Sequence, residues 1–368
     1  MPQSSQPGNA RRGLNRRRLI EGFGAPALLA WALGPLCRAR AFTQALAADI
    51  AADDNLLLVG GPATGRLAQW ANLICPLLGP ALGGGGSLHW TAVGAADGVT
   101  AANQFDARVS PDGNTALLLP GSAAIAQLIG DPRARFDAGT WVAGFAGLSS
   151  TVVMGRVPLT ELPANAPLVV LADDPSGADL PVLLGLTLLG YRVKPVSLQS
   201  TLGDARAALV QGQIDIAALS DASVRNVAPW QKSGLVPLFS LGSIDAAGGP
   251  LPDPAFPALP PLESLLLAKG IDTTGPLPTA WRALSTAKQL TLGLVLPQLT
   301  PASRVAQWRQ ACADGIASLT IQAIAATESL RFVTQPAAAA VISALTAPAG
   351  AQLELHRWLA NQLGWRPS

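Results

Sequence analysis

Short aliphatic runs alternate along the chain with segments in which apolar residues recur every three or four positions. The first pair begins with the run Asn55–Val59, continues through a glycine-containing turn at 60–65, and ends with the amphipathic segment Arg66–Leu78. A short aliphatic run predicts a buried strand, and the amphipathic period predicts a helix that stops at Gly79 and Pro80. This part of the chain is therefore expected to form a strand-turn-helix unit.

The same alternation continues through the chain and indicates the fold class. Helical patterns such as Thr201–Val210 separate most of the aliphatic runs, as expected when helices cover both faces of a mostly parallel sheet. We therefore expect an α/β fold. The further predicted strands are Leu88–Val93, Thr115–Leu119, Val152–Met154, Leu168–Ala172, Arg192–Val196, Ile214–Leu219, Leu235–Leu241 and Thr291–Leu296.

The length of the chain predicts two lobes, because a single hydrophobic core stops growing at about 250–300 residues. We expect one lobe to contain residues 42–153 and 285–368 and the other to contain residues 154–284, with two crossovers between them. Proline and glycine dominate Ala246–Pro261, which predicts a long loop that rims a cleft or crosses between the lobes.

The N-terminal segment has the pattern of an export signal. Arginines in Asn15–Ile20 precede two apolar residues, and the apolar run Phe23–Leu36 follows. This order is typical of a twin-arginine signal, and the run is shorter than the roughly 20 residues that a membrane span needs. Small residues at Ala39 and Ala41 predict cleavage near Ala41, so we expect residues 1–41 to be removed and the mature protein to lie in the periplasm.

Removal of the signal changes the charge of the protein. Residues 1–41 hold seven of the 25 basic side chains and one of the 23 acidic ones, so the remaining chain has a net charge of −4. No basic patch remains to bind nucleic acid or an anionic membrane surface. Nucleic acid is therefore not an expected partner.

Two cysteines remain in the mature chain, Cys75 and Cys312, and their spacing fits neither a metal site nor a redox motif. Each falls on an apolar stripe with helical spacing, beside Trp70 and Trp308 respectively. We expect two buried thiols, and a disulfide formed in an oxidising compartment is the alternative.

Three segments in a fixed order carry a family resemblance. The strongest combines the glycine-rich turn Gly94–Gly98 with Arg108–Leu118, which leads into a strand. Asp204–Asp221 follows as a helix and strand, and Lys232–Leu238 as a strand before a proline-rich loop. With these segments the chain resembles the solute-binding proteins of tripartite tricarboxylate transporters, also called Bug receptors. The resemblance implies a two-lobed periplasmic binding protein, type II-like, with no cofactor, no metal and no catalytic residue.

The resemblance also implies a ligand and a place for it. In that family, backbone amides of strand-to-helix loops hold a ligand carboxylate between the lobes, and such loops do present unpaired amides at helix N-termini. We therefore expect a monomer that binds a small carboxylate-bearing metabolite and delivers it to membrane permease subunits or a sensor kinase. The expected ligand-binding residues are Gly61, Pro62, Ala63, Thr64, Gly65 and Arg66 in the first loop, Gly121, Ser122 and Ala123 in the second, Asp174, Ser176, Gly177 and Ala178 in the third, and Ser220 and Asp221 in the fourth.

Several of these side chains allow two interpretations. Thr64 and Ser122 either orient a ligand or cap the helix that each opens. Arg66 lies in a first helical turn, where a cation opposes the helix dipole at a cost of about 0.3–1 kcal/mol. Either a bound anion offsets that cost or Arg66 points to solvent. Asp173 and Asp174 favour an amine-bearing ligand over a plain dicarboxylate, because they repel a second carboxylate.

Few residues are suited to catalysis. His89 lies in a predicted strand and His356 in an amphipathic helix, so both are expected to be structural, and the sequence has no nucleophile elbow, phosphate-binding loop or zinc-binding motif. Three hypotheses remain: a solute receptor, a degenerate family member that acts as a protein-interaction module, and a hydrolase that uses Ser176 and a carboxylate pair. The receptor is the leading hypothesis.

Overall fold

The computed structural model describes residues 55–83, 87–163, 166–198 and 202–366, all within one compact unit that spans Asp53–Ser368. The predicted export signal and its cleavage site lie outside the described residues. Within the described ranges, no helix is both long enough and apolar enough to cross a membrane.

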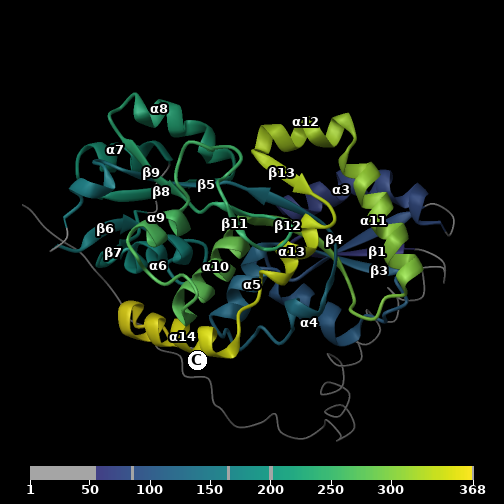
Figure 1. Cartoon of the computed structure of the whole chain (residues 1–368). Helices are drawn as coiled ribbons and strands as arrows, with labels where there is room; N and C mark the ends of the chain where they lie inside the picture. Colours follow the sequence, from purple (N-terminus) through teal and green to yellow (C-terminus); the bar gives the residue numbers. More distant parts are fainter. Residues whose placement is uncertain (1–54, 84–86, 164–165, 199–201, 367–368) are drawn as a thin grey trace, which may run out of the picture. The chain divides into compact units, whose positions relative to one another are not determined.

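Two mixed sheets form the frame of the fold (Figure 1). The first has the strand order β13-β4-β12-β3-β1-β2, and the second has the order β7-β6-β8-β5-β9. Their strands are β1 Asn55–Gly60, β2 Leu88–Val93, β3 Thr115–Leu119, β4 Val142–Ser149, β12 Leu290–Leu296 and β13 Leu330–Val333 in the first sheet, and β5 Thr151–Gly155, β6 Leu168–Leu171, β7 Val193–Val196, β8 Ile216–Ser220 and β9 Val236–Ser240 in the second.

Helices cover both sheets, as the alternating pattern predicts, and Figure 1 shows α3 and α11 side by side at the first sheet. The predicted helix after β1 is confirmed with the expected bounds as α3. The helices are α3 Arg66–Leu78, α4 Val99–Arg108, α5 Gly121–Leu128, α6 Leu180–Leu188, α7 Leu202–Val210, α8 Val227–Gln231, α9 Leu262–Ala268, α10 Pro276–Gln289, α11 Ala302–Ile316, α12 Leu319–Glu328, α13 Ala337–Ser343 and α14 Ala349–Leu363.

The α/β class is confirmed, and in each mixed sheet most strands run in one direction while a minority runs against them. Strand β1 is parallel to β2 and β3, and β6 is parallel to β7 and β8. Strand β12 runs antiparallel to β3 and β4, and β5 runs antiparallel to β8 and β9. These two central strands are the ones that enter directly from the other half of the fold, and they therefore run against their neighbours.

The chain passes between the sheets twice, as expected for a two-lobed fold. The first crossing is at Ser150, which separates β4 of the first sheet from β5 of the second. The second is at Gln289 and Leu290, where α10 ends and β12 begins. Helix α10 packs against both α5 and α6, so it contacts helices that belong to both sheets. The predicted lobe boundaries at 153/154 and 284/285 stay a prediction.

Alternate residues of the strands pack against opposite faces of the first sheet. Leu57 and Val59 belong to a core that includes Trp70 of α3 and Trp308 of α11. Leu58 belongs to the other core, with residues of α4, α5 and α10. Strands buried on both faces appear in the sequence as continuous aliphatic runs, and this explains why most of them were recognisable.

Cys75 and Cys312 are free and buried, as expected. Cys75 and Cys312 lie in the core between α3, α11 and the first sheet. Burial raises the pKa of the Cys75 thiol to about 12, and it also raises the pKa of the Cys312 thiol. Both thiols are therefore inert core residues.

The predicted loop before Pro261 has more structure than its composition suggests. Within this loop, Pro250–Leu251 (β11) pairs antiparallel with Ser243–Ile244 (β10), which lies just before the loop. The backbone amides of Ala247 and Gly249 both donate to Asp245 Oδ1, at 2.8 and 2.7 Å, which closes the turn between these strands.

Candidate functional site

The second predicted loop packs against the junction between α10 and β12 at residues 287–291. Gly121 approaches this junction so closely that an added Cβ would lie 1.8 Å from the carbonyl oxygen of Ala287 and 2.8 Å from that of Leu290. Any larger residue at this position would collide with backbone, so glycine is required here by packing rather than by its φ angle.

The first, third and fourth loops reach the same junction. Asp221 of the fourth loop accepts a hydrogen bond from Thr291 Oγ1 at 3.2 Å, and Arg66, next to the first loop, donates to Asp221 Oδ1 at 3.2 Å. The charge of Lys288 acts on Asp179, which follows the third loop. Residues from all four loops therefore lie near the start of β12.

The first loop exposes side chains and uses part of its backbone internally. Gly61 has a φ of +144° and donates its amide to β2 at 3.0 Å, while the amide of Gly65 donates to the carbonyl of Pro62 at 2.8 Å. Pro62, Ala63 and Thr64 are exposed. Gly61 and Gly65 therefore shape the loop, and their amides are not available to a ligand.

Thr64 and Ser122 do not cap their helices, so the capping interpretation is wrong for both. The N-cap of α3 is Gly65, which leaves Thr64 outside the cap position, and no side chain accepts a cap hydrogen bond there. Ser122 lies inside the first turn of α5, and its hydroxyl donates to the carbonyl of Asp97 at 3.2 Å.

The third loop is held together by its own carboxylates. Asp174 Oδ2 accepts a hydrogen bond from the amide of Ala178 at 3.0 Å, and the amide of Asp174 donates to Asp179 Oδ2 at 3.0 Å. A Cβ at Gly177 would lie 1.9 Å from Asp174 Oδ2, so this arrangement requires glycine. Asp174 is thus engaged within the loop that it was expected to equip for ligand binding.

Lys288, which the sequence patterns did not single out, is the cation of this region. Burial raises the pKa of the Asp179 carboxyl, and the amide of Asp174 and the Lys288 ammonium act in the opposite direction. Asp173 lies nearby and accepts a hydrogen bond from Ser197 Oγ at 2.6 Å. Lys288 is half-buried at the end of α10, and its charge acts on Asp179, as do the charges of Asp173 and Asp174.

Arg66 is paired with carboxylates of its own chain. It contacts Asp221 at 3.2 Å and Glu328 at 2.9 Å, and Trp70 Nε1 also donates to Glu328 at 3.2 Å. These two carboxylates offset the unfavourable position of a cation in the first turn of α3. Neither expected interpretation of Arg66 applies, because it neither awaits a bound anion nor points freely to solvent. Instead, Arg66, Asp221 and Glu328 form an internal charged cluster.

The fourth loop has a strained residue at its centre. Asp221 adopts a φ of +51°, a conformation that costs a non-glycine residue about 1–3 kcal/mol unless its surroundings stabilise it. Its contacts with Arg66 and Thr291 provide that stabilisation. The amide of the neighbouring Ser220 donates to Ser223 Oγ at 2.8 Å, so it also is not free for a ligand.

Three of the expected loops keep backbone donors unused. Within the described ranges, the amides of Ala63, Thr64, Ser122 and Ser176 have no hydrogen-bond acceptor. Thr64 and Ser122 are exposed and Ser176 is half-buried. An unpaired amide at the start of a helix is a donor for an anion. The site therefore offers at least one donor from each of three loops, and Lys288 supplies an ammonium.

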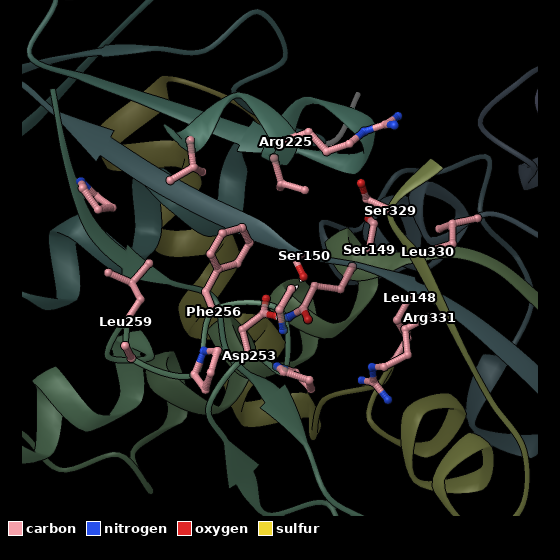
Figure 2. A pocket seen from close by; sticks show the side chains of 18 of the residues that line it. Leu148, Ser149, Ser150, Arg225, Asp253, Phe256, Leu259, Ser329, Leu330 and Arg331 are labelled. Carbon is pink, nitrogen blue, oxygen red and sulfur yellow. Dashed lines mark hydrogen bonds between the residues drawn. The ribbon is translucent and has the colours of Figure 1, made fainter. Parts of the chain in front are cut away.

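A separate cavity of about 850 Å³ has a lining that includes none of the expected ligand-binding residues (Figure 2). Its walls come from the crossings at Ser150 and Gln289, from α8, from the start of β13 and from the loop segment 253–259. Figure 2 shows the ring of Phe256 on one wall and Asp253 beside Ser150. The predicted loop before Pro261 therefore does rim a cavity.

The described residues contain little that points to metal or nucleophilic chemistry. Within the described ranges, no group of three or more histidine, cysteine or acidic residues is arranged to hold a metal ion. His356 Nε2 lies 3.0 Å from the carbonyl oxygen of Leu128, and its ring packs on Gly130, which agrees with its expected structural role.

Comparison with known proteins identifies the fold. No protein-family model matches the sequence, and no curated protein matches it. A TctC solute-binding protein from Polaromonas, without ligand, has 14% identity and a TM-score of 0.59 over 84% of this chain and 98% of its own. Its structure shows that this chain has the fold of a periplasmic solute-binding protein.

Two further structures align over similar lengths with lower TM-scores. The periplasmic binding protein BugD has 15% identity and a TM-score of 0.47 over 86% of this chain and 99% of its own. MatC from Rhodopseudomonas palustris with bound malate has 18% identity and a TM-score of 0.46 over 84% of this chain and 98% of its own.

Proposed function

We propose that this chain, which has the fold of a TctC solute-binding protein, is a divergent member of that family that binds a small carboxylate-bearing metabolite without transforming it. The ligand lies where the first three loops meet Lys288. The carboxylate accepts hydrogen bonds from the amides of Thr64, Ser122 and Ser176 and pairs with the Lys288 ammonium.

The observation that carries this proposal is the position of Lys288. Lys288 directly follows Ala287, whose carbonyl Gly121 approaches, and its charge acts on Asp179. Amides on three separate loops have no acceptor within the described ranges. Donors from separate loops act together only on a group small enough to reach all of them. A carboxylate meets this requirement with two acceptor oxygens and one negative charge.

The charges around Lys288 favour a monocarboxylate over a dicarboxylate. Asp173, Asp174 and Asp179 all contribute to the electrostatics of this region, whereas Lys288 is the single cation that acts on Asp179 among the described residues. A second carboxylate on the ligand is repelled by the three acidic groups. An amine on the ligand is attracted by them, so an amine-bearing monocarboxylate is the favoured class.

The cellular role follows from the same proposal. The twin-arginine-like segment 1–41 directs export to the periplasm, and the mature monomer delivers its ligand to a tripartite tricarboxylate-type permease or to a sensor kinase. One lobe comprises residues 42–153 together with 285–368, and the other lobe comprises residues 154–284. Replacing Arg16 and Arg17 together with Lys, which keeps the charge, leaves the precursor in the cytoplasm; normal export of this double variant contradicts the twin-arginine assignment.

A thermal-shift screen of small carboxylates tests the binding site. At a ligand concentration of about 100 times the dissociation constant, binding stabilises the protein by roughly 2.7 kcal/mol and raises the melting temperature by several degrees. Thr64→Pro removes an amide donor and abolishes the shift, whereas the matched variant Thr64→Ala keeps the amide and retains it. Ser176→Ala keeps its amide and retains most of the shift.

The internal pairing of Arg66 favours the protein-interaction module as the second candidate. Arg66 is neutralised by Asp221 and Glu328, so it is not open to a ligand. If no carboxylate raises the melting temperature, the receptor proposal fails and this candidate replaces it. A hydrolase remains the third candidate, and ester or amide turnover that disappears in Ser176→Ala is the result that favours it.

A further inference from the structure

The separate cavity of about 850 Å³ has a buried carboxylate in its wall. Asp253 is 2% exposed, and its Oδ1 accepts hydrogen bonds from Ser150 Oγ at 2.8 Å and from the amide of Ala255 at 2.9 Å. The second oxygen, Oδ2, has no hydrogen-bond partner among the described residues. Burial raises the pKa of this carboxyl, which shows that its ionised form lacks full compensation.

A cationic side chain, the exposed Arg331, lines the same cavity. Arg331 donates through Nη2 to Ser243 Oγ at 3.0 Å, its only hydrogen bond within the described ranges. Partial burial lowers the pKa of its guanidinium, and Asp253 opposes this change. Arg331 and Asp253 therefore act on each other electrostatically, but they form no ion pair in the part of the chain that the structure describes.

The remaining wall is apolar and large enough for a small molecule. Phe256, Leu259 and Val224 line it, together with Leu330 at the start of β13. Figure 2 shows the Phe256 ring, Asp253 and Arg331 in the wall of this single cavity. A volume of about 850 Å³ is typical of small-molecule sites, which are mostly apolar with a few polar groups that fix orientation.

Two opposite charges that face one cavity without pairing are best satisfied by a ligand that carries both charges. A plain carboxylate pairs with Arg331 but is repelled by Asp253, and a plain amine has the reverse problem. A zwitterion pairs with both, and each contact is a charge-assisted hydrogen bond. An apolar group on the same molecule then contacts the wall around Phe256.

We propose that this cavity is a second ligand site, separate from the loop site at Lys288, and that it binds a free α-amino acid with a large apolar side chain. The ligand carboxylate contacts Arg331, the ammonium contacts Asp253 Oδ2, and the side chain packs on Phe256. This proposal does not depend on the proposed function of the loop site, because the two sites share no residue.

Calorimetric titration of the mature protein with phenylalanine, 3-phenylpropanoate and phenethylamine tests the proposal. Phenylalanine binds at least about tenfold more tightly than either compound that lacks one charge. Asp253→Asn keeps an oxygen that can accept from Ser150 and Ala255 but removes the negative charge. It therefore weakens phenylalanine binding by about tenfold and strengthens 3-phenylpropanoate binding, because the repulsion of the carboxylate is lost.

The opposite changes in Asp253→Asn cannot arise from a loss of folding, which would weaken both ligands. Asp112→Asn, at an exposed carboxylate that does not line the cavity, is the matched control and leaves both affinities unchanged. The proposal is overturned if phenylalanine does not bind, if 3-phenylpropanoate binds equally well, or if Asp253→Asn leaves the affinity for phenylalanine unchanged.

Discussion

Arg66 Nη1 lies 3.2 Å from Asp221 Oδ1 and joins the helix that follows β1 of the first sheet to the turn that follows β8 of the second. Glu328 binds the same guanidinium at 2.9 Å. One cation is thus shared by two carboxylates, and the cluster carries a net negative charge beside the loop that is proposed to bind an anion. This arrangement leads to the first prediction.

Glu328→Gln strengthens carboxylate binding at the loop site by about three- to tenfold. The variant removes one of two negative charges from Arg66 and keeps an oxygen that can accept from Trp70 Nε1. The loss of a partly exposed ion pair lowers the free energy of unfolding by no more than about 1 kcal/mol. Calorimetric titration measures the affinity of Glu328→Gln for the carboxylate. Affinity equal to or weaker than that of the wild type contradicts an influence of the Arg66 cluster on the loop site.

The third loop depends on Gly177. In Gly177→Ala the new Cβ collides with Asp174 Oδ2, so the hydrogen bond from the amide of Ala178 is lost. We expect a decrease of about 1–3 kcal/mol in the free energy of unfolding, measured by urea denaturation, and a weaker carboxylate-induced thermal shift. Gly350→Ala, inside α14 with open space around the added carbon, is the matched control and is neutral or slightly stabilising. If Gly177→Ala has the same free energy of unfolding and the same thermal shift as the wild type, the described structure of this loop is contradicted.

The buried carboxylate of Asp253 predicts a pH-dependent difference between variant and wild type. Because the pKa of this group is raised in the folded state, its ionised form is disfavoured there, and stability is lost as the pH rises from the ordinary aspartate range through the folded-state pKa. Asp253→Asn removes this loss. We therefore expect the variant to be more stable than the wild type at pH 7. This advantage disappears below the pH range in which an aspartate ordinarily titrates.

Urea denaturation of both proteins between pH 3 and pH 7, with ~1 pH unit between points, measures this difference. Contributions from other acidic groups cancel in the comparison. An advantage of Asp253→Asn that is the same at all pH values shows that the carboxyl does not titrate as described.

The sequence predicted the elements that are buried on both faces or amphipathic. Helix α3 was predicted with its observed bounds, because its apolar stripe ends sharply at Gly79 and Pro80. Strand β4 was missed because its core positions are small. A Cβ at Gly144 would lie 2.7 Å from a methyl carbon of Leu294, so close packing against β12 replaces the usual aliphatic run with glycine and alanine.

The loops could be predicted from the sequence, whereas their contacts could not. Each loop is marked locally by glycine, serine or proline after an aliphatic run. Arg66, Asp221 and Glu328 are separated by 155 and 262 residues along the chain, and nothing in a local pattern indicates that they meet. Lys288 was overlooked for the same reason, because its relevance depends on the third loop, more than a hundred residues earlier in the sequence.

The most direct test of a carboxylate site at the loops is a calorimetric titration of Lys288→Met with the carboxylate that gives the largest thermal shift in the wild type. Lys194→Met, at an exposed lysine on β7, is the matched control. We predict that Lys288→Met weakens binding by about tenfold or more, since a charge-assisted contact is lost, and that Lys194→Met binds as the wild type does. Equal affinity of Lys288→Met and wild type would contradict the proposed site.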